Sequence, residues 1–556
     1  MLDTTARPVL LGVNGKPITS AKSTIPHRPR NSGYSYSNAN TQKPSMKGWN
    51  WRGGGPDDDL VANLPVLRQM SRQLEYDSSI VDGLFSTRTT LSIGKGLTPE
   101  PTPDVEYLGW SSEQAQKFKA QALRFFEAWA ETPRNCDARG HDNFYELTRI
   151  ASRSQDVNGD AFALLPRITR PHSIGDLKIS LVEGDCVDNP DDSSALAQHN
   201  LGIDTFGGIS ESPGGEVLGV WFCTEHPLAI RHRNRLPNLE RKRWHFVPLY
   251  CSETGEPLIL HLMDTKRIRQ RRGIPVIASS IEILLLMDKF VHAYATKAEI
   301  QALFTAIITS ERPDAAMVEL ESLMSAEEAN ELASGYSDSL LALGSGIVQA
   351  ANPGDKITAI ESTAPSSDFG AYIGAGLEMI GPSVGVSKGF LTHTFPNSFS
   401  AARAETGLTW ESMLQKRAGI ITDFCQPTYE AILAEGVATG YVDAPGFFDN
   451  YITRRAYTNC RWRGPGMPQI EPRQSLAAYK EGMAIGIITG SEAASEYSGS
   501  DFYENVAARG REIQAATNAG LMTPVPAGQG TAAAKEVVAE SSDDKNDETN
   551  EEVAQE

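Results

Sequence analysis

One serine in this sequence stands in a motif that is typical of nucleophilic catalysis. Residues 385–389 read Gly-Val-Ser-Lys-Gly and match G-x-S-x-G, the nucleophile elbow of α/β-hydrolases, with Ser387 in the nucleophile position. That chemistry needs a strand before the motif and a helix after it, because a strained turn must expose the serine oxygen. Here a helical pattern precedes the motif and a polar loop follows it, which favours a flexible loop bracketed by glycines. A hydrolase that uses Ser387 stays open as an alternative.

A cluster of aspartates is the second candidate for chemistry, because carboxylates can bind a metal ion. The cluster consists of Asp185, Asp188, Asp191 and Asp192. It lacks the glycine and the terminal glutamate of an EF-hand loop, and its Asn-Pro pair is typical of a turn. The sequence contains neither H-E-x-x-H nor G-x-x-x-x-G-K-[ST]. We expect no metal, no other cofactor and no enzymatic activity, with a metal-dependent hydrolase at residues 185–192 as the alternative.

Positive charge gathers in two short runs. One run, between residues 231 and 243, is rich in arginine, and the other forms a basic patch in the sequence: Lys266, Arg267, Arg269, Arg271 and Arg272. A solvated loop is the simpler interpretation. A surface that faces phosphates or a partner protein is the functional one.

The net charge of −19 is spread unevenly along the chain. Residues 523–556 carry nine acids against two lysines, whereas residues 1–47 carry seven lysines and arginines against Asp3 alone. An acidic body argues against tight, non-specific binding of duplex DNA, which depends on neutralising phosphates. It is compatible with a protein past which DNA slides.

The bulk composition is that of a folded globular chain, with 40% hydrophobic and 22% charged residues. The six cysteines form no C-x-x-C pair, which favours reduced thiols in the cytoplasm. No stretch approaches the roughly 20 apolar residues of a membrane helix. The short apolar run at residues 9–13 lacks a signal-peptide layout. We expect no membrane partner.

Hydrophobic periodicity predicts a predominantly helical α+β fold between two flexible tails. Helices are predicted at residues 60–77, 79–93, 113–131, 144–155, 275–304, 325–341, 366–384, 400–435, 474–486 and 492–518. Strands are predicted at residues 161–168, 178–182, 217–223, 245–249, 307–308 and 347–348. Pro427 predicts a bend in the helix of residues 400–435, because proline interrupts the hydrogen-bond ladder.

Several segments, in this order, resemble the lambda-type portal proteins of siphophages. The segments are Phe126-Glu-Ala-Trp129, Cys136-Asp137, Phe144-Tyr-Glu-Leu147, Gly159-Asp-Ala-Phe162, Arg271-Arg-Gly273-Ile-Pro275, Gly385-Val-Ser387, Leu391-Thr392, Asn397, Phe399-Ser-Ala-Ala-Arg403-Ala404 and Trp410. The last of these is similar to the family signature Asn-Tyr-Ser-Ser-Ala-Arg-Ala, with Phe399 for tyrosine and Ala401 for the second serine. The collinear resemblance covers residues 48–522.

The resemblance implies a homo-oligomeric ring, a dodecamer in the virion, at one vertex of the capsid. It implies a wing at residues 48–274, stem helices at 275–303 and 365–384, a clip at 304–364, and a tunnel loop at 385–399. A tunnel helix at 400–435, a return to the wing at 436–473 and a crown at 474–522 complete the chain. Such a ring is a conduit for double-stranded DNA during packaging and ejection, is assembled in the host cytoplasm, and has as partners the terminase motor, a head–tail connector, and capsid and scaffold proteins.

The same resemblance implies roles for individual residues. The tunnel loop would contact DNA through Lys388, His393, Thr394 and Asn397, and Arg403 would hold the base of the loop. The acidic clip helix would attract a basic partner through Glu327, Glu328 and Glu331.

Overall fold

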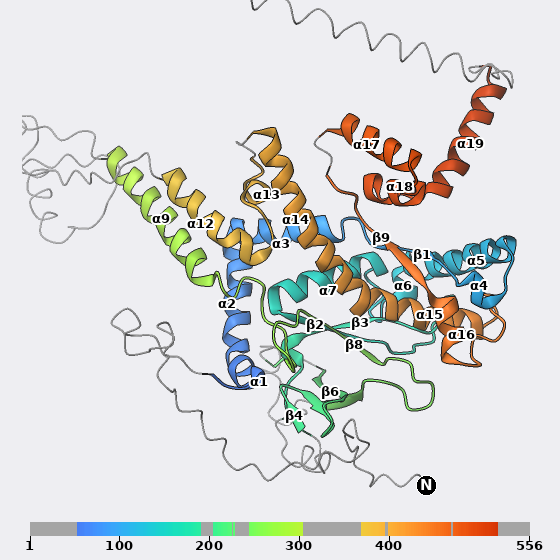
Figure 1. Cartoon of the computed structure of the whole chain (residues 1–556). Helices are drawn as coiled ribbons and strands as arrows, with labels where there is room; N and C mark the ends of the chain where they lie inside the picture. Colours follow the sequence, from blue (N-terminus) through green and yellow to red (C-terminus); the bar gives the residue numbers. More distant parts are fainter. Residues whose placement is uncertain are drawn as a thin grey trace, which may run out of the picture. The chain divides into compact units, whose positions relative to one another are not determined.

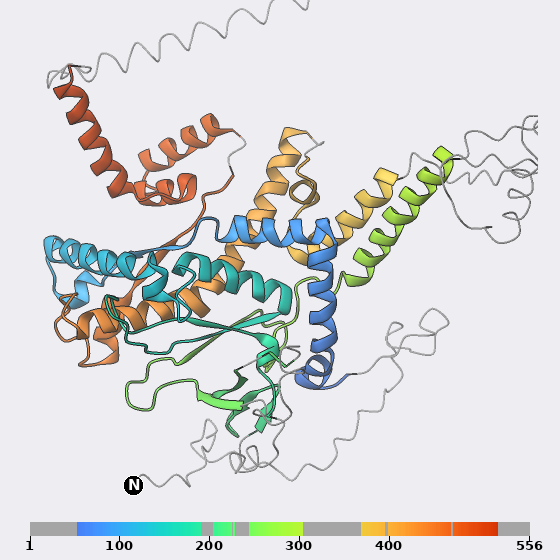
Figure 2. The same ribbon diagram turned by 180° about the vertical axis from the view of Figure 1, so that it is seen from behind.

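The computed structural model describes residues 53–190, 204–224, 226–227, 244–303, 369–394, 398–468 and 471–520. The chain divides into two units, Met1–Trp462 and Arg463–Glu556. Figures 1 and 2 show the elements of each unit from two sides. Among the helices of the described segments, none is both long and apolar enough to cross a bilayer.

Helices dominate the amino-terminal half of the first unit. They are α1 (Pro56–Leu60), η3 (Val61–Asn63), α2 (Leu64–Asp77), α3 (Ser79–Ser92), α4 (Val105–Leu108), α5 (Ser112–Ala130), α6 (Pro133–Cys136) and α7 (Phe144–Asn158). The helices predicted at 79–93, 113–131 and 144–155 are confirmed. Capping boxes fix where two of them begin, Ser111 with Gln114 for α5 and Asn143 with Glu146 for α7.

Two antiparallel sheets follow. The first has the order β3-β2-β8 and the second β4-β5-β6-β7. Their strands are β2 (Asp160–Leu164), β3 (Ser180–Glu183), β4 (Asp204–Phe206), β5 (Ile209–Glu211), β6 (Val217–Cys223), β7 (Trp244–Pro248) and β8 (Ile259–Met263), with the short helix η4 (Gly184–Cys186) after β3. The prediction for residues 217–223 is confirmed at both ends, and β4, β5 and β8 were not predicted. Phe162 stands at the centre of β2, opposite Val182 on β3 and His261 on β8.

The main core joins these sheets to helices from both ends of the unit. Phe126, Trp129 and Phe144 pack with Phe424 and Tyr429, all of them buried. The rings of Phe126 and Phe144 meet edge to face at 5.3 Å, and those of Phe144 and Phe424 stack at 5.9 Å. This core therefore fixes α5 and α7 against a segment almost 300 residues further along the chain.

A two-helix hairpin consists of α9 (Ile281–Leu303) and α12 (Phe369–Val384), which lie side by side in both views (Figures 1 and 2). The helices approach closely where α12 lacks side chains: a Cβ atom on Gly376 would lie 2.5 Å from Sδ of Met287. Both helices were predicted, although α9 begins six residues after Pro275 because residues 276–280 form turns. The predicted elements within residues 304–368 lie outside the described residues.

The long helix predicted for residues 400–435 is continuous but changes its winding. It comprises α14 (Phe399–Ile420), a π-helical turn η7 (Ile421–Cys425) and α15 (Gln426–Ala438). Pro427 occupies the first turn of α15. The π-helical turn directly before it is the irregularity that accommodates the missing proline amide.

The remaining elements of the first unit are α16 (Tyr451–Thr458) and the strand pair β1 (Thr98–Pro101) with β9 (Cys460–Arg463). The second unit contains α17 (Pro472–Ala484), α18 (Gly490–Ser498) and α19 (Phe502–Asn518). The prediction of one helix over residues 492–518 is wrong, because Gly499 adopts a left-handed conformation (φ 69°) and ends α18.

Candidate functional site

The segment between α12 and α14 begins with a tightly held turn. Gly385 has a φ of 71°, which is the left-handed region, and a Cβ atom at this position would lie 2.0 Å from Oγ of Ser412. Val386 is buried and donates its amide to the carbonyl of Gly381 at 3.1 Å. Ser387 is the N-cap residue of α13 (Lys388–Thr392), and its amide donates to Oγ1 of Thr409 on α14 at 3.1 Å. The base of the loop is therefore packed against both helices.

The tip of the same segment faces solvent. Nζ of Lys388 lies 2.9 Å from Oε1 of Glu378 on α12, in a pair whose side chains are both exposed by a third or more. His393 is exposed in a left-handed conformation (φ 52°), and Thr394 is exposed beside it. Of the predicted loop residues, His393 and Thr394 thus form the exposed polar tip, whereas Lys388 lies at the start of α13 and pairs with α12. Asn397 lies outside the described residues.

Arg88 on α3 fixes the point where the loop leaves α12. Its Nε and Nη2 donate to the two carboxylate oxygens of Asp156 at 3.1 and 3.0 Å, and its Nη1 donates to the carbonyl of Val384. Lys416 of α14 forms an ion pair with the same Asp156. Burial alone would raise the pKa of Asp156, but Arg88 and Lys416 outweigh burial and hold it below its ordinary value. Burial lowers the pKa of Lys416 to about 8.

A second arginine fastens α14 to α3. Arg417 is buried, its Nε donates to the carbonyl of Ser92 at 2.7 Å, and its guanidinium lies 5.1 Å from the centroid of the Trp410 ring. Burial lowers the pKa of Arg417 to about 10. Arg403, predicted to support the loop, is exposed on the first turns of α14. Arg88 and Arg417 were not singled out from the sequence, because each pairs with groups distant in the chain.

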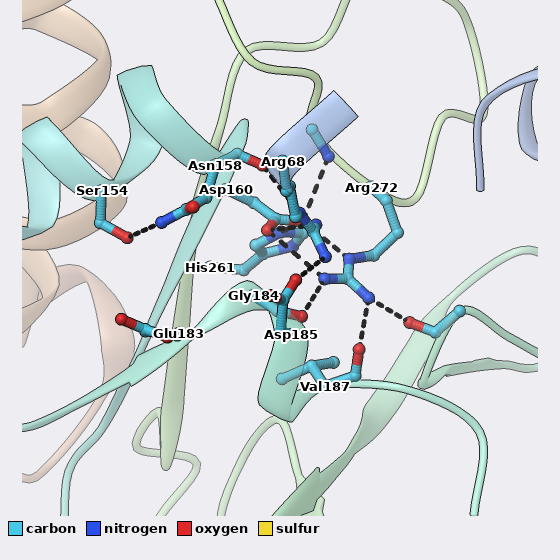
Figure 3. A network of polar contacts seen from close by, with 12 residues as sticks. Arg68, Ser154, Asn158, Asp160, Glu183, Gly184, Asp185, Val187, His261 and Arg272 are labelled. Carbon is cyan, nitrogen blue, oxygen red and sulfur yellow. Dashed lines mark hydrogen bonds and ion pairs between the residues drawn. The ribbon is translucent and has the colours of Figure 1, made fainter. Parts of the chain in front are cut away.

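A third buried network surrounds Asp160 at the start of β2 (Figure 3). Its carboxylate accepts hydrogen bonds from Nη2 of Arg68 at 2.8 Å and Nε of Arg272 at 2.7 Å. Burial would raise the pKa of Asp160, but the two guanidinium groups outweigh it and hold the pKa far below its ordinary value. His261 lies 3.7 Å from the same carboxylate, and burial lowers the pKa of this imidazole. The network joins α2, both sheets and the segment before α9.

Comparison with known proteins assigns the chain to a protein family. A family model described as "Phage portal protein, lambda family" matches residues 42–417. The chain belongs to this family. Portal proteins of this family are located at a vertex of the phage capsid, and this chain is a portal protein with the same location. The family is structural rather than enzymatic.

One curated relative and two chains of solved structures each align with most of this chain. Portal protein B of Escherichia phage lambda is 20% identical over 529 residues, which cover 93% of this portal chain and 94% of the relative. A chain from the neck of an empty gene transfer agent particle is 12% identical and covers 78% of this chain and 92% of its own length, with a TM-score of 0.37. A chain from the virion of a native gene transfer agent particle has the same identity and coverage, with a TM-score of 0.35.

The five cations of the basic patch are not all exposed in this portal chain, contrary to the expectation from the sequence. Arg271 and Arg272 are buried: Arg271 pairs with Asp57, Asp204 and Glu211, while Arg272 donates to the carbonyls of Gly184, Val187 and Gly207 as well as to Asp160. The prediction of one exposed patch is therefore wrong for these two arginines, because internal carboxylates and carbonyls take up their hydrogen bonds. Lys266, Arg267 and Arg269 are exposed, although Arg267 pairs with Asp59 at 2.7 Å.

The hydrolase interpretations lack their structural context. A helix, α12, precedes the Gly-Val-Ser-Lys-Gly motif where the nucleophile elbow needs a strand. Asp185 of the acidic cluster pairs with Arg68 at 3.0 Å and Arg72 at 2.6 Å, whereas Asp191 and Asp192 lie outside the described residues. Within the part of the chain that the structure describes, no group of three or more potential ligands is placed to hold a metal ion.

Proposed function

We propose that this portal protein assembles as a homo-oligomeric ring, a dodecamer in the virion, through which double-stranded DNA is packaged and ejected. Family membership supports the role. The structural observation behind the proposal concerns the segment between α12 and α14. Arg88 and Gly385 hold the base of this segment, and its polar tip is exposed. A loop built in this way can contact a moving ligand without disturbing the fold, because its stability resides in its base.

The regions of the ring follow the order of the chain. Residues 48–274 and 436–473 form the wing, α9 and α12 the two stem helices, residues 304–364 the clip and residues 385–399 the tunnel loop. Residues 400–435 form the tunnel helix and residues 474–522 the crown. Two of the three buried polar networks support this division: Arg88 fastens α3 and α7 to the end of α12, and Arg417 fastens α14 to α3. The third network, around Asp160, lies within residues 48–274 and holds the wing together.

DNA passes the ring by sliding along a surface that binds it weakly. The net charge of −19 opposes tight binding of phosphates, since each neutralised phosphate adds affinity that motion must then break. Lys388, His393, Thr394 and Asn397 provide sparse polar and cationic contacts at the loop tip. Arg403, exposed on α14, holds the base of the loop.

The other partners bind at the periphery of the ring. The terminase motor and the head–tail connector dock on the clip, where Glu327, Glu328 and Glu331 attract a basic surface; these glutamates lie outside the described residues. Capsid and scaffold proteins are further partners of the ring. The ring is assembled in the host cytoplasm and stays in the virion.

Electron microscopy of the purified full-length chain tests the ring and the loop together. We expect closed rings, an elution volume far above that of a 60.4 kDa monomer, and residues 385–399 lining the channel in a reconstruction. A monomeric chain would contradict the ring. Residues 385–399 on the outer surface would contradict the tunnel loop even if rings form.

A further inference from the structure

A group of exposed apolar side chains lies on α4 (Val105–Leu108), on α16 (Tyr451–Thr458) and on the segment just before α16. We call it the α4–α16 patch; its exposed fractions are Val105 37%, Tyr107 50%, Phe448 61%, Tyr451 79% and Ile452 63%. The two helices lie side by side at one end of the first unit (Figure 1). Oη of Tyr107 is 3.3 Å from Oγ1 of Thr453, which joins the helices within the patch. Clustered exposed aromatic residues of this kind mark interaction surfaces.

Contacts with buried residues and backbone hydrogen bonds hold the patch in place. Phe447 is buried, and its ring meets those of Phe448 at 5.0 Å and Tyr457 at 5.9 Å. The amide of Asp104 donates to the carbonyl of Ala456 at 2.9 Å, so the start of α4 is fixed to α16. Asn450 caps α16 by accepting from the amide of Thr453. A rigid surface loses little entropy when it binds a partner.

The rim of the patch is acidic. Asp104 and Glu106 flank Val105, and Asp449 follows Phe448; all three carboxylates are exposed. The two arginines of α16 are already paired, Arg454 with Glu256 at 3.6 Å and Arg455 with Glu430 at 2.6 Å. The complementary ligand is therefore an apolar segment with cations on either side.

The chain itself contains such a segment. Residues 9–13 read Val-Leu-Leu-Gly-Val, with Arg7 before them and Lys16 after them, in a stretch of 47 residues whose only acid is Asp3. From Val13 to Gly53 the chain can extend by about 130 Å, which exceeds the diameter of a folded unit of this size. Tethering also raises the effective concentration, so a weak contact suffices for occupancy.

We propose that the α4–α16 patch binds residues 7–16 of the chain's own amino-terminal segment. The apolar run covers Tyr451 and Ile452, and its flanking cations lie beside the acidic rim. The contact does not depend on the proposed ring or on DNA, so it can be tested separately from both.

Hydroxyl-radical labelling of the full-length chain provides the first test. Deletion of residues 1–47 is expected to raise the labelling of Tyr107 and Tyr451 several-fold, and so is the double variant Leu10→Asp/Leu11→Asp. Thr19→Asp/Ser20→Asp is the matched control in the same segment and should leave the labelling unchanged. Equal labelling of both tyrosines with and without residues 1–47 would overturn the proposal, whether the patch is bare or covered by another molecule.

A peptide of residues 5–18 provides the second test, on the chain that lacks residues 1–47. The peptide is expected to restore protection of Tyr451, and to lose affinity at least ten-fold for the Tyr451→Ser/Ile452→Ser variant. Tyr76→Ser is the control, since Tyr76 is 84% exposed on α2, outside the patch. Equal affinity for the patch variant and the control would also overturn the proposal.

Discussion

The guanidinium of Arg88 on α3 donates a hydrogen bond to the backbone carbonyl of Val384, the last residue of α12, across 296 positions of sequence. The same guanidinium forms an ion pair with Asp156 on α7. One side chain therefore connects the end of α12 to α3 and α7, directly before the segment that we propose to line the channel.

Replacing Arg88 should destabilise the first unit strongly. Arg88→Ala leaves the carbonyl of Val384 without this donor and leaves Asp156 with Lys416 alone, and losing one partner of a buried ion pair costs about 3–5 kcal/mol. A lower urea midpoint with an unchanged slope would report this loss. Arg149→Ala is the matched control, because Arg149 belongs to an exposed pair with Glu146 on α7. Similar midpoints for the two variants would contradict the anchoring role.

The conformation of Gly385 should tolerate no side chain. Gly385→Ala places a Cβ atom against Oγ of Ser412 in a left-handed conformation, which by itself costs roughly 1 kcal/mol. The double variant Gly385→Ala/Ser412→Gly should recover the part that is due to the clash. Gly407→Ala on α14 is the control, since nothing lies within 4 Å of its Cβ position and alanine favours the helix. Thermal unfolding measures all three, and a neutral Gly385→Ala would contradict the packing of the loop base.

The tip of the tunnel loop should matter for DNA rather than for folding. Lys388→Ala/His393→Ala/Asn397→Ala should change the free energy of unfolding by less than about 0.5 kcal/mol per site and leave rings intact, as is usual for surface substitutions; Lys388 and His393 both reach solvent. Packaging or retention of DNA should fall. Gln116→Ala/Lys117→Ala/Arg124→Ala on α5 is a control of the same size on the wing. Normal packaging by the loop variant would count against a tunnel position.

Acid should loosen the network around Asp160. Its folded pKa is lowered, so this carboxylate stabilises the fold fully above its unfolded pKa of 3.8, and the stabilisation is lost as the pH falls below that value. His261 adds an earlier loss, because its folded pKa is also lowered and the unfolded imidazole takes up a proton below about pH 6.5. Amide exchange in β2 should therefore accelerate from about pH 6.5 downward after correction for intrinsic rates. His261→Gln should remove the early part only; a profile unchanged by that variant would contradict the assignment.

Charge reversal in the clip should separate partner binding from assembly. Glu327→Lys/Glu328→Lys should weaken binding of the terminase motor or the connector while leaving ring formation intact, because it replaces attraction for a basic surface by repulsion. Pull-down of each partner at two salt concentrations measures the effect. Glu253→Lys/Glu216→Lys, two exposed changes on the wing, is the control. Unchanged packaging in the clip variant would count against the docking assignment.

The sequence by itself determined the elements whose signals are local. Apolar residues at helical spacing and polar caps specify α5 and α7, and the β-branched and aromatic run of residues 217–223 specifies β6. The break between α12 and α14 was also predicted, because glycines and polar residues interrupt two apolar helical patterns, but the short helix α13 within it was not. Such features depend on residues a few positions apart, which share one face or one turn.

Only the tertiary structure decided which charged groups act together. Five cations within seven residues give no sign that Arg272 is buried against Asp160 while Lys266 remains in solvent. Arg88 resembles any helical arginine until α7 and the end of α12 are brought to it. The reason is physical: a buried charge is stable only beside partners that the topology supplies, and these partners come from elements far apart in the chain.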